Sequence, residues 1–359
     1  MKTEAIVFED QFKVGVWSMD LPSLADNQVL LKTYYSSISP GTELRTLAGK
    51  EKHASPFPLV PGYSTVGEII EFGNKVTGLK KGTMACVRGG IALSDKIGSS
   101  WGGHASHIIV PQEEAFILPD GIDYRNATLV ALLATALHGV DLANVRIKEQ
   151  VAVIGLGLVG QLCARLLHYC GANVVGTDIL EYRRKIAQEA GITIVECSAN
   201  LRQAFAAHFP YGAELVLDAT GSSKTMKSSL SLLRDKPRQD PCGSAQVGGS
   251  ENKLSMFEIL KKQSHLLNGW RGPRLIAQGS YADPMEICYY DVFDNEAGFI
   301  VPRVHELKDV FRAIELLADA KFNLNGMFSK AHSYKDAPDV YQELRKNPSG
   351  TITECFSWK

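Results

Sequence analysis

Short runs rich in strand-forming residues recur along the first third of the chain. Such runs occur at 28–33, 65–71, 84–87 and 107–110, and glycine and proline residues separate them. Short β-rich runs at this spacing, separated by turn residues, predict strands. We therefore expect a compact β-barrel-like unit in this part of the chain.

The pattern then changes to strand, glycine turn, long helix and strand. The apolar run 151–154 precedes a helix expected over 159–170, and another apolar run follows at 173–175. This order predicts a βαβ unit with parallel strands. An apolar helix expected over 127–142 connects the two units, and helical spacing returns at 307–318, where we expect the chain to rejoin the first unit.

About 40 residues separate Arg234 from the next expected strand, 274–278. Such connections usually need only a few residues. We therefore interpret 235–273 as an insertion, with a helix near 255–265. A surface or subunit-contact element is the plainer interpretation of this insertion, and a substrate lid is the alternative.

The turn after the first strand of the βαβ unit has the spacing Gly-x-Gly-x-x-Gly. The first glycine permits a tight turn, the second lets the backbone approach a pyrophosphate, and the third allows close packing of helix and strand. The helix N-terminus then faces the phosphates. We predict a dinucleotide site that includes Gly155, Gly157, Leu158, Val159 and Gly160.

Asp178 follows the second strand of the unit, 18 residues after Gly160. A carboxylate at this place accepts hydrogen bonds from the adenosine ribose and repels a 2′-phosphate. Arg183 and Arg184 come next and offer a way to neutralise such a phosphate. We expect the cofactor to be NAD rather than NADP, with Arg183 in its site.

Composition narrows the partners to a small-molecule substrate. The chain has 38 Lys+Arg against 39 Asp+Glu and no basic run, so neither a nucleic acid nor a membrane surface is an expected partner. Its seven cysteines show no CxxC pair, which indicates reduced thiols and a cytoplasmic location. The first residues look like a strand rather than a signal peptide. We also expect a homodimer or homotetramer.

Several stretches of both units resemble the medium-chain dehydrogenase/reductase superfamily, which includes alcohol, sorbitol and threonine dehydrogenases. Besides the glycine motif, they are Ser39–Glu43, Pro61–Gly67, Gly102–Ala105, Leu133–Leu137 and Asp218–Gly221. The resemblance implies an α/β fold: a GroES-like β-barrel catalytic domain at 1–142 and 292–359, with a Rossmann domain, a doubly wound parallel sheet, at 143–291.

Three positions depart from the zinc-dependent members of this family. Pro40 stands where they have a cysteine, Tyr63 where they have a histidine, and Ala131 where they have a third ligand. None of these side chains offers a thiolate, imidazole or carboxylate donor. The stretch 88–101 also lacks the four cysteines of their structural zinc site. We expect no metal, as in a zinc-free branch loosely similar to bacteriochlorophyllide dehydrogenases.

Without zinc to polarise the substrate oxygen, side chains must do so. The resemblance makes Tyr63 the first candidate, although it is as easily a tyrosine that fills the former metal position. Thr42 aligns with the family's substrate-bonding hydroxyl. His104 and Glu43 are further catalytic candidates, with structural roles as the alternative. Arg45 replaces a proton-relaying histidine and is a candidate partner for a substrate carboxylate or phosphate.

The resemblance places Thr135 behind the nicotinamide ring. Residues that follow later strands of the Rossmann domain are expected to line the cofactor crevice as well. These residues are Thr220, Gly221, Gly279, Ser280 and Tyr281.

Taken together, these observations predict a zinc-independent NAD(H)-dependent oxidoreductase. Its reaction would interconvert a ketone and a secondary alcohol that is polar, cyclic or sugar-like. The alternatives are an alkene or quinone reductase, a redox-neutral epimerase or lyase that keeps NAD bound, and a non-enzymatic nucleotide-binding protein.

Overall fold

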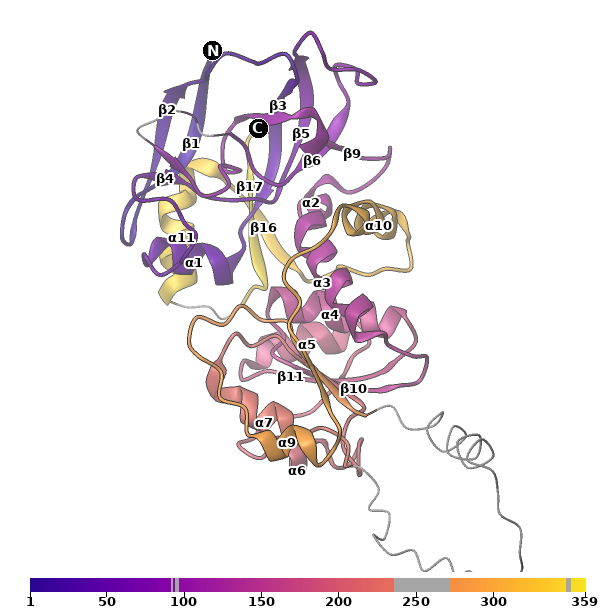
Figure 1. Cartoon of the computed structure of the whole chain (residues 1–359). Coiled ribbons are helices and arrows are strands. Elements are labelled where there is room, and N and C mark those ends of the chain that lie inside the picture. The colour runs from indigo at the N-terminus through magenta and orange to yellow at the C-terminus, as the bar shows by residue number, and fades with distance from the viewer. Residues whose placement is uncertain (92, 94–96, 236–271, 347–349) are drawn as a thin grey trace, which may run out of the picture.

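The computed structural model describes residues 1–91, 93, 97–235, 272–346 and 350–359. It forms two lobes, a β-rich lobe at 1–129 and 301–359 and a parallel-sheet lobe at 130–300 (Figure 1). Nearly all of the expected insertion, with its expected helix, lies outside the described residues. Among the helices that are described, none is long and apolar enough to cross a membrane.

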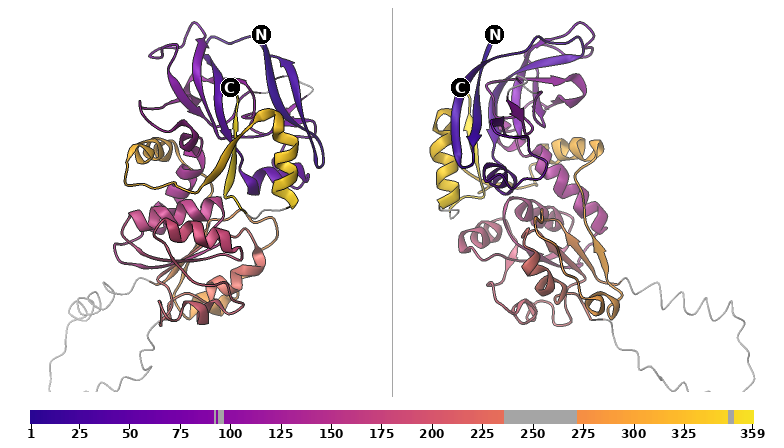
Figure 2. Two further views of the ribbon diagram at one scale, coloured as in Figure 1. Left: turned by 180° about the vertical axis from the view of Figure 1, so that it is seen from behind. Right: turned by 60° about the vertical axis from the view of Figure 1, so that its left-hand side comes forward.

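The β-rich lobe is built from both ends of the chain (Figure 2). One sheet has the order β2-β1-β4-β7, and the other has the order β16-β17-β3-β5-β6-β9, with β8 also paired to β3. The four strands expected at 28–33, 65–71, 84–87 and 107–110 are confirmed as β3, β5, β6 and β8. The strands are β1 (Lys2–Asp10), β2 (Lys13–Asp20), β3 (Gln28–Ser37), β4 (Leu59–Val60), β5 (Thr65–Phe72), β6 (Met84–Val87), β7 (Gly98–Ser99), β8 (His107–Pro111), β9 (Phe116–Ile117), β16 (Phe328–Ser333) and β17 (Thr353–Ser357).

Helices close the open sides of this lobe. β17 pairs antiparallel with β3, which brings the C-terminal segment against the first sheet strands. The buried face of α11 packs Tyr341 against Phe8 of β1, with ring centroids 5.0 Å apart. The helices are α1 (Pro40–Leu47), α2 (Tyr124–Ala127), α10 (Leu307–Ala318) and α11 (Ala337–Lys346), with 3-10 turns at Gln112–Glu114 and Tyr334–Asp336.

The parallel-sheet lobe has the strand order β12-β11-β10-β13-β14-β15. All of its strand pairs are parallel, as the βαβ pattern predicted. The strands are β10 (Gln150–Ile154), β11 (Asn173–Thr177), β12 (Thr193–Ile194), β13 (Leu215–Asp218), β14 (Arg274–Ala277) and β15 (Gly298–Ile300). The helices are α3 (Val130–Ala143), α4 (Leu158–Tyr169), α5 (Glu181–Glu189), α6 (Leu201–Phe205), α7 (Met226–Leu230) and α9 (Tyr289–Phe293), with a 3-10 turn at Ser223–Thr225.

Strand β10 lies in the middle of this sheet and is covered on both faces. Val151 and Val153 belong to the core shared with α3 and α4, whereas Ala152 and Ile154 belong to the core under α6 and α7. A strand buried on both faces reads as a continuous apolar run, not an alternating one. The uninterrupted apolar sequence 151–154 therefore fits a central strand. The glycine turn follows at the carboxyl end of this strand.

One strand of the parallel sheet lies beyond the expected domain boundary at residue 291. Strand β15 pairs parallel with β14, so the sheet extends to Ile300 before the chain returns to the β-rich lobe. The cause is physical: β15 is a short edge strand, and its three residues are exposed or half-buried. Three residues are too few to give the strand pattern that identified the inner strands.

A buried ion pair joins the end of α3 to the sheet. The Arg274 guanidinium, at the start of β14, donates to both carboxylate oxygens of Glu149, at 2.6 and 2.9 Å. It also donates to the carbonyls of Ala143 and Asn144 at the C-terminus of α3. Burial alone raises the pKa of Glu149, but the hydrogen bonds and charge of Arg274 outweigh it and hold that pKa below its ordinary value of 4.5.

We expect Glu149→Gln to lower the free energy of unfolding by about 3 kcal/mol, because removal of one partner leaves the Arg274 charge buried without its counter-ion. The folded pKa of Glu149 lies below the unfolded one. The carboxylate therefore stabilises the fold fully above pH 4.5 and loses this effect as the pH falls further.

Urea unfolding of the variant and the parent between pH 3 and pH 7 measures both effects. Asp141→Asn, which breaks the exposed Arg312 pair, is the matched control and should cost at most about 1 kcal/mol. Equal losses in the two variants would contradict a structural role for the buried pair.

Candidate active site

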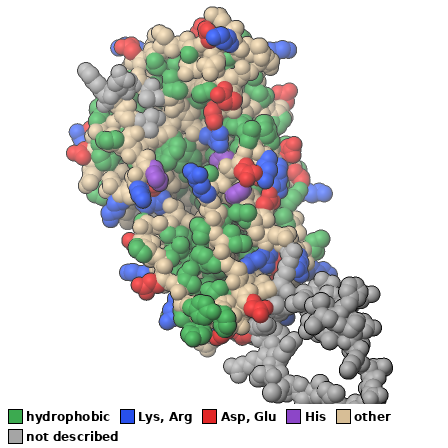
Figure 3. Space-filling view, viewed as in Figure 1, with side chains coloured by type: hydrophobic (Ala, Val, Ile, Leu, Met, Phe, Trp, Pro, Cys, Tyr) green, Lys and Arg blue, Asp and Glu red, His purple; other side chains and the backbone are tan. Residues whose placement is uncertain are grey.

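A cavity of about 1010 Å³ opens between the two lobes. Its walls come from the start of α1, the turn after β4, the loop after β6, the helix α3, the glycine loop and the segment 302–305. Figure 3 shows Lys, Arg and His side chains gathered along the junction of the lobes. The volume and the mixed lining suit a dinucleotide together with a small substrate.

The glycine loop has the conformation that a dinucleotide site needs. Gly155 has a φ of +86°, a region that favours glycine. A Cβ on Gly160 would lie 1.8 Å from the carbonyl oxygen of Gly155, so only glycine lets α4 pack this close to the turn. Gly157 caps α4 and lines the cavity with Leu158 and Val159. The helix N-terminus therefore faces the space where phosphates would bind.

Most of the residues expected to bind the cofactor line this cavity. Four of them do not: Gly155 and Gly160, which shape the glycine loop from behind, and Asp178 and Tyr281. The expected residues that do line it are Thr135, Arg183, Thr220, Gly221, Gly279 and Ser280.

Asp178 is buried at the carboxyl end of β11. One of its oxygens accepts the backbone N–H of Leu156 at 2.7 Å, and the other accepts the N–H of Leu180 at 2.9 Å. Arg183 Nη1 lies 3.4 Å from the first oxygen. The carboxylate thus holds the glycine loop and sits beside Arg183, which lines the cavity.

Tyr281, which was expected to bind the cofactor, does not line the cavity. Its hydroxyl donates to Asp218 Oδ1 at 2.8 Å, and Thr220 Oγ1 donates to the same oxygen at 2.7 Å. Burial and the Asp218 charge raise the pKa of Tyr281. Tyr281 therefore supports the loops that follow β13 and β14.

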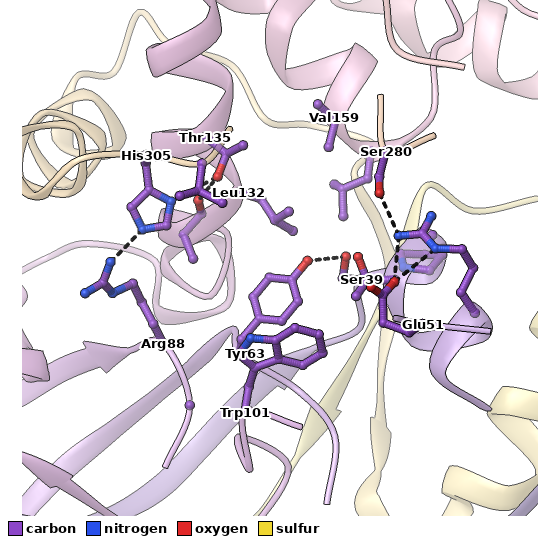
Figure 4. A pocket seen from close by; sticks show the side chains of 18 of the residues that line it. Ser39, Glu51, Tyr63, Arg88, Trp101, Leu132, Thr135, Val159, Ser280 and His305 are labelled. Carbon is purple, nitrogen blue, oxygen red and sulfur yellow. Dashed lines mark hydrogen bonds and ion pairs between the residues drawn. The ribbon is translucent and has the colours of Figure 1, made fainter. Parts of the chain in front are cut away.

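Two hydroxyl groups meet at the floor of the cavity. Tyr63 donates its phenolic proton to Ser39 Oγ at 2.5 Å, and Figure 4 shows both groups facing the space between the lobes. Burial raises the pKa of Tyr63, although hydrogen bonds with Ser39 and Thr42 oppose this effect. Thr42 lines the cavity beside them. Ser39 was not singled out from the sequence, because its role depends on the orientation of one loop.

A buried network holds Ser39 in place. Glu43 Oε1 accepts the backbone N–H of Ser39 at 2.7 Å, and Glu43 Oε2 accepts from His104 Nε2 at 3.0 Å and from the Tyr341 hydroxyl. His104 Nδ1 lies 2.8 Å from Ser36 Oγ. The Glu43 and His104 side chains are fully buried and do not line the cavity. These two catalytic candidates therefore lie behind the loop that carries Ser39 and not at the wall of the cavity.

Arg45 connects the two lobes at the rim of the cavity. Its guanidinium lies 3.1 Å from a Glu51 carboxylate oxygen and donates to Ser280 Oγ at 3.0 Å. The charge expected to bind a substrate anion is therefore paired with Glu51. His138 Nδ1 lies 3.2 Å from an Asp309 oxygen.

His305 is a site residue that the sequence did not reveal. Arg88 Nη1 can only donate, so the bond of 2.8 Å to His305 Nε2 leaves the ring proton on Nδ1, 3.0 Å from Thr135 Oγ1. Burial and the neighbouring Arg88 charge lower the pKa of His305 to about 4. A neutral imidazole thus joins Thr135 to the opposite wall, where Arg88 forms an ion pair with Glu114. No local sequence pattern marks this chain of contacts.

The residues at the family's metal position do not fit zinc. Pro40, Tyr63 and Ala131 all line the cavity, and the one polar atom among these side chains, the Tyr63 hydroxyl, is bonded to Ser39. Zinc sites in proteins use cysteine, histidine and carboxylate ligands. Within the described ranges, no three His, Cys, Asp or Glu side chains group closely enough to hold a metal ion.

Two family models match the chain. The model described as alcohol dehydrogenase GroES-like domain matches residues 25–120, and the one described as zinc-binding dehydrogenase matches residues 159–283. L-galactonate-5-dehydrogenase of Escherichia coli K12 is 30% identical over 259 residues, which cover 65% of this chain and 74% of the relative.

Solved structures share the fold over 99% of both chains. A candidate zinc-binding dehydrogenase from Sinorhizobium meliloti 1021 bound to NADP has a TM-score of 0.79 at 22% identity. An alcohol dehydrogenase from Escherichia coli CFT073 complexed with NADH has a TM-score of 0.80 at 16% identity. With the GroES-like lobe, the parallel-sheet lobe and the L-galactonate-5-dehydrogenase relative, these matches identify the chain as a member of the medium-chain dehydrogenase/reductase superfamily.

Proposed function

We propose that this oxidoreductase interconverts a ketone and a polar secondary alcohol, cyclic or sugar-like, with NAD(H) and without zinc. The Tyr63–Ser39 hydroxyl pair carries this proposal: both residues line the cavity, and Tyr63 stands where the resemblance places a histidine ligand of zinc. The L-galactonate-5-dehydrogenase relative acts, by its name, on a polyhydroxylated substrate, which supports the substrate class. A homodimer or homotetramer in the cytoplasm stays a prediction.

The cleft fits a nicotinamide dinucleotide, which supplies or accepts the hydride when bound. The N-terminus of α4 offers backbone N–H groups to its pyrophosphate, and nothing but the Arg183 side chain comes within 4 Å of a Cβ placed on Gly157. Thr135, fixed by His305, and Gly279 line the space between this helix and Tyr63. We infer that NAD is preferred, since the Asp178 carboxylate repels a 2′-phosphate.

Tyr63 is the proton donor to the substrate oxygen in this mechanism. Burial raises the pKa of Tyr63, so the phenol stays protonated at neutral pH. When substrate binds, the phenolic proton turns from Ser39 to the carbonyl oxygen of the substrate. As the carbonyl carbon gains the hydride, the oxygen takes the Tyr63 proton. Ser39 and Thr42 then return a proton from solvent to the phenolate. In alcohol oxidation the same proton travels outward along this path.

We expect Tyr63→Phe to lower turnover by about 10²–10⁴-fold, the typical cost of losing a positioned proton-transfer group. The ring that packs on Trp101 remains, so affinity for NADH, measured by fluorescence titration, should not change. Tyr35→Phe, on strand β3 and outside the cavity, is the matched control and should keep full turnover.

Initial rates of NAD(H)-dependent oxidation and reduction across a panel of cyclic and open-chain alcohols and ketones test the proposal. Near-normal turnover of Tyr63→Phe would show that this tyrosine merely fills the former metal position. Reduction of alkenes or quinones alone would instead identify the reductase alternative, and bound NAD without net reduction would favour the epimerase or lyase.

The Asp178 carboxylate should make the parent protein bind NAD(H) more tightly than NADP(H). We expect Asp178→Ser to narrow this difference. Asp178→Asn separates the effect of the charge from that of the hydrogen bond. It keeps an oxygen that accepts the Leu156 N–H but removes the negative charge that repels a 2′-phosphate. Calorimetric titration of both cofactors into the three proteins measures the ratio of dissociation constants, and equal affinities in the parent would overturn the NAD assignment.

A further inference from the structure

Trp101 has an unusual backbone conformation at the wall of the cavity. Its φ is +76°, a region that a bulky L-residue rarely occupies and that persists only where surrounding contacts enforce it. The chain then runs through Gly102, whose φ is also positive, at +65°. Such strain often marks a functional position, so the indole is a candidate for a direct role.

Three nearby glycines surround the Trp101 backbone closely. The Gly90 N–H donates to the carbonyl oxygen of Trp101. A Cβ on Gly89, itself at φ +120°, would lie 2.1 Å from that oxygen, so no larger side chain fits there. Gly102 donates its N–H to the Val60 carbonyl at 3.2 Å. These contacts hold the Trp101 backbone from both sides.

The indole lies directly beside the proposed proton donor. The Trp101 and Tyr63 rings meet edge to face, with centroids 5.2 Å apart and planes at 68°. In Figure 4, Trp101 lies next to the Tyr63 ring, and Glu51 lies beyond Ser39 on the same side. Trp101 is only half-buried and lines the cavity, so part of its surface remains open to a ligand.

Polar groups complete the surroundings of the indole. Glu51, ion-paired with Arg45, and the exposed His53 line the same cavity as Trp101. A flat aromatic surface with hydrogen-bonding groups nearby suits a ligand that has one apolar face and several hydroxyls. A saturated ring that carries hydroxyl groups has this character, because its C–H bonds form the apolar face.

We propose that Trp101 determines specificity by stacking on the C–H face of a hydroxylated saturated ring. This inference rests on the proposed function and narrows its substrate to cyclic polyols, such as a sugar ring or a cyclitol. An open-chain polyol presents no such flat face and gains less from the contact. The ring would lie against the indole with one hydroxyl at Tyr63.

The test compares two probes with equal carbon number and a vicinal diol each, trans-cyclohexane-1,2-diol and hexane-2,3-diol. The measured quantity is the ratio of kcat/KM for the cyclic diol to that for the open-chain diol, with NAD. We expect Trp101→Leu, which keeps an apolar side chain but removes the flat surface, to lower this ratio by about tenfold, as expected for loss of one aromatic contact.

Two further variants separate stacking from general packing. Trp101→Phe keeps a flat ring and should restore the ratio to within about threefold of the parent. Trp17→Leu makes the same exchange at a half-buried tryptophan of β2, outside the cavity, and should leave the ratio unchanged. A ratio that is the same in the parent and in Trp101→Leu would overturn the inference while leaving the proposed reaction intact.

Ligand-observed NMR with the NADH complex gives a second measurement that needs no turnover. We expect saturation transfer to the ring protons of the cyclic diol in the parent and in Trp17→Leu, and much less in Trp101→Leu. If neither diol is oxidised by the parent, the proposed reaction on this substrate class fails, and the NMR result alone decides the stacking contact. Equal saturation transfer to the cyclic diol in all three proteins would refute the stacking contact with Trp101.

Discussion

The buried carboxylate of Glu43 ties together parts of the β-rich lobe that lie far apart in the sequence. It accepts hydrogen bonds from the Ser39 backbone, from His104 and from Tyr341 near the C-terminus. A carboxylate without such partners would be very costly to bury, so these contacts fix its position and that of the loop. Ser39 then receives the Tyr63 hydroxyl in one defined place. The proton path of the proposed reaction depends on this anchor.

The parallel-sheet lobe could be predicted from the sequence because its signals are local. The apolar run 151–154, the glycine spacing and the amphipathic helix after it each identify one element, and their order fixes the topology. The loop residues that line the cleft followed from the carboxyl ends of the strands. Strand β15 was missed because a short, partly exposed edge strand has no strong pattern.

The other half of the site depends on contacts between distant segments, which no local pattern shows. His104 and Glu43 resemble catalytic residues in type, yet the fold buries them behind the loop. His305 becomes a site residue only because the segment after β15 crosses the cleft and meets Thr135 and Arg88. The strain at Trp101 is likewise a property of the folded backbone. Sequence could name the residue types but could not say which faced the cavity.

We propose that hydroxyl groups, not zinc, act at the metal position of this family member. Metal analysis of the purified protein, combined with assays before and after dialysis against a chelator, tests it most directly. We expect far less than one zinc per chain and unchanged turnover after chelation, since Pro40, Tyr63 and Ala131 supply none of the usual zinc ligands. A stoichiometric zinc whose removal abolishes turnover, and whose return restores it, would contradict a zinc-free mechanism.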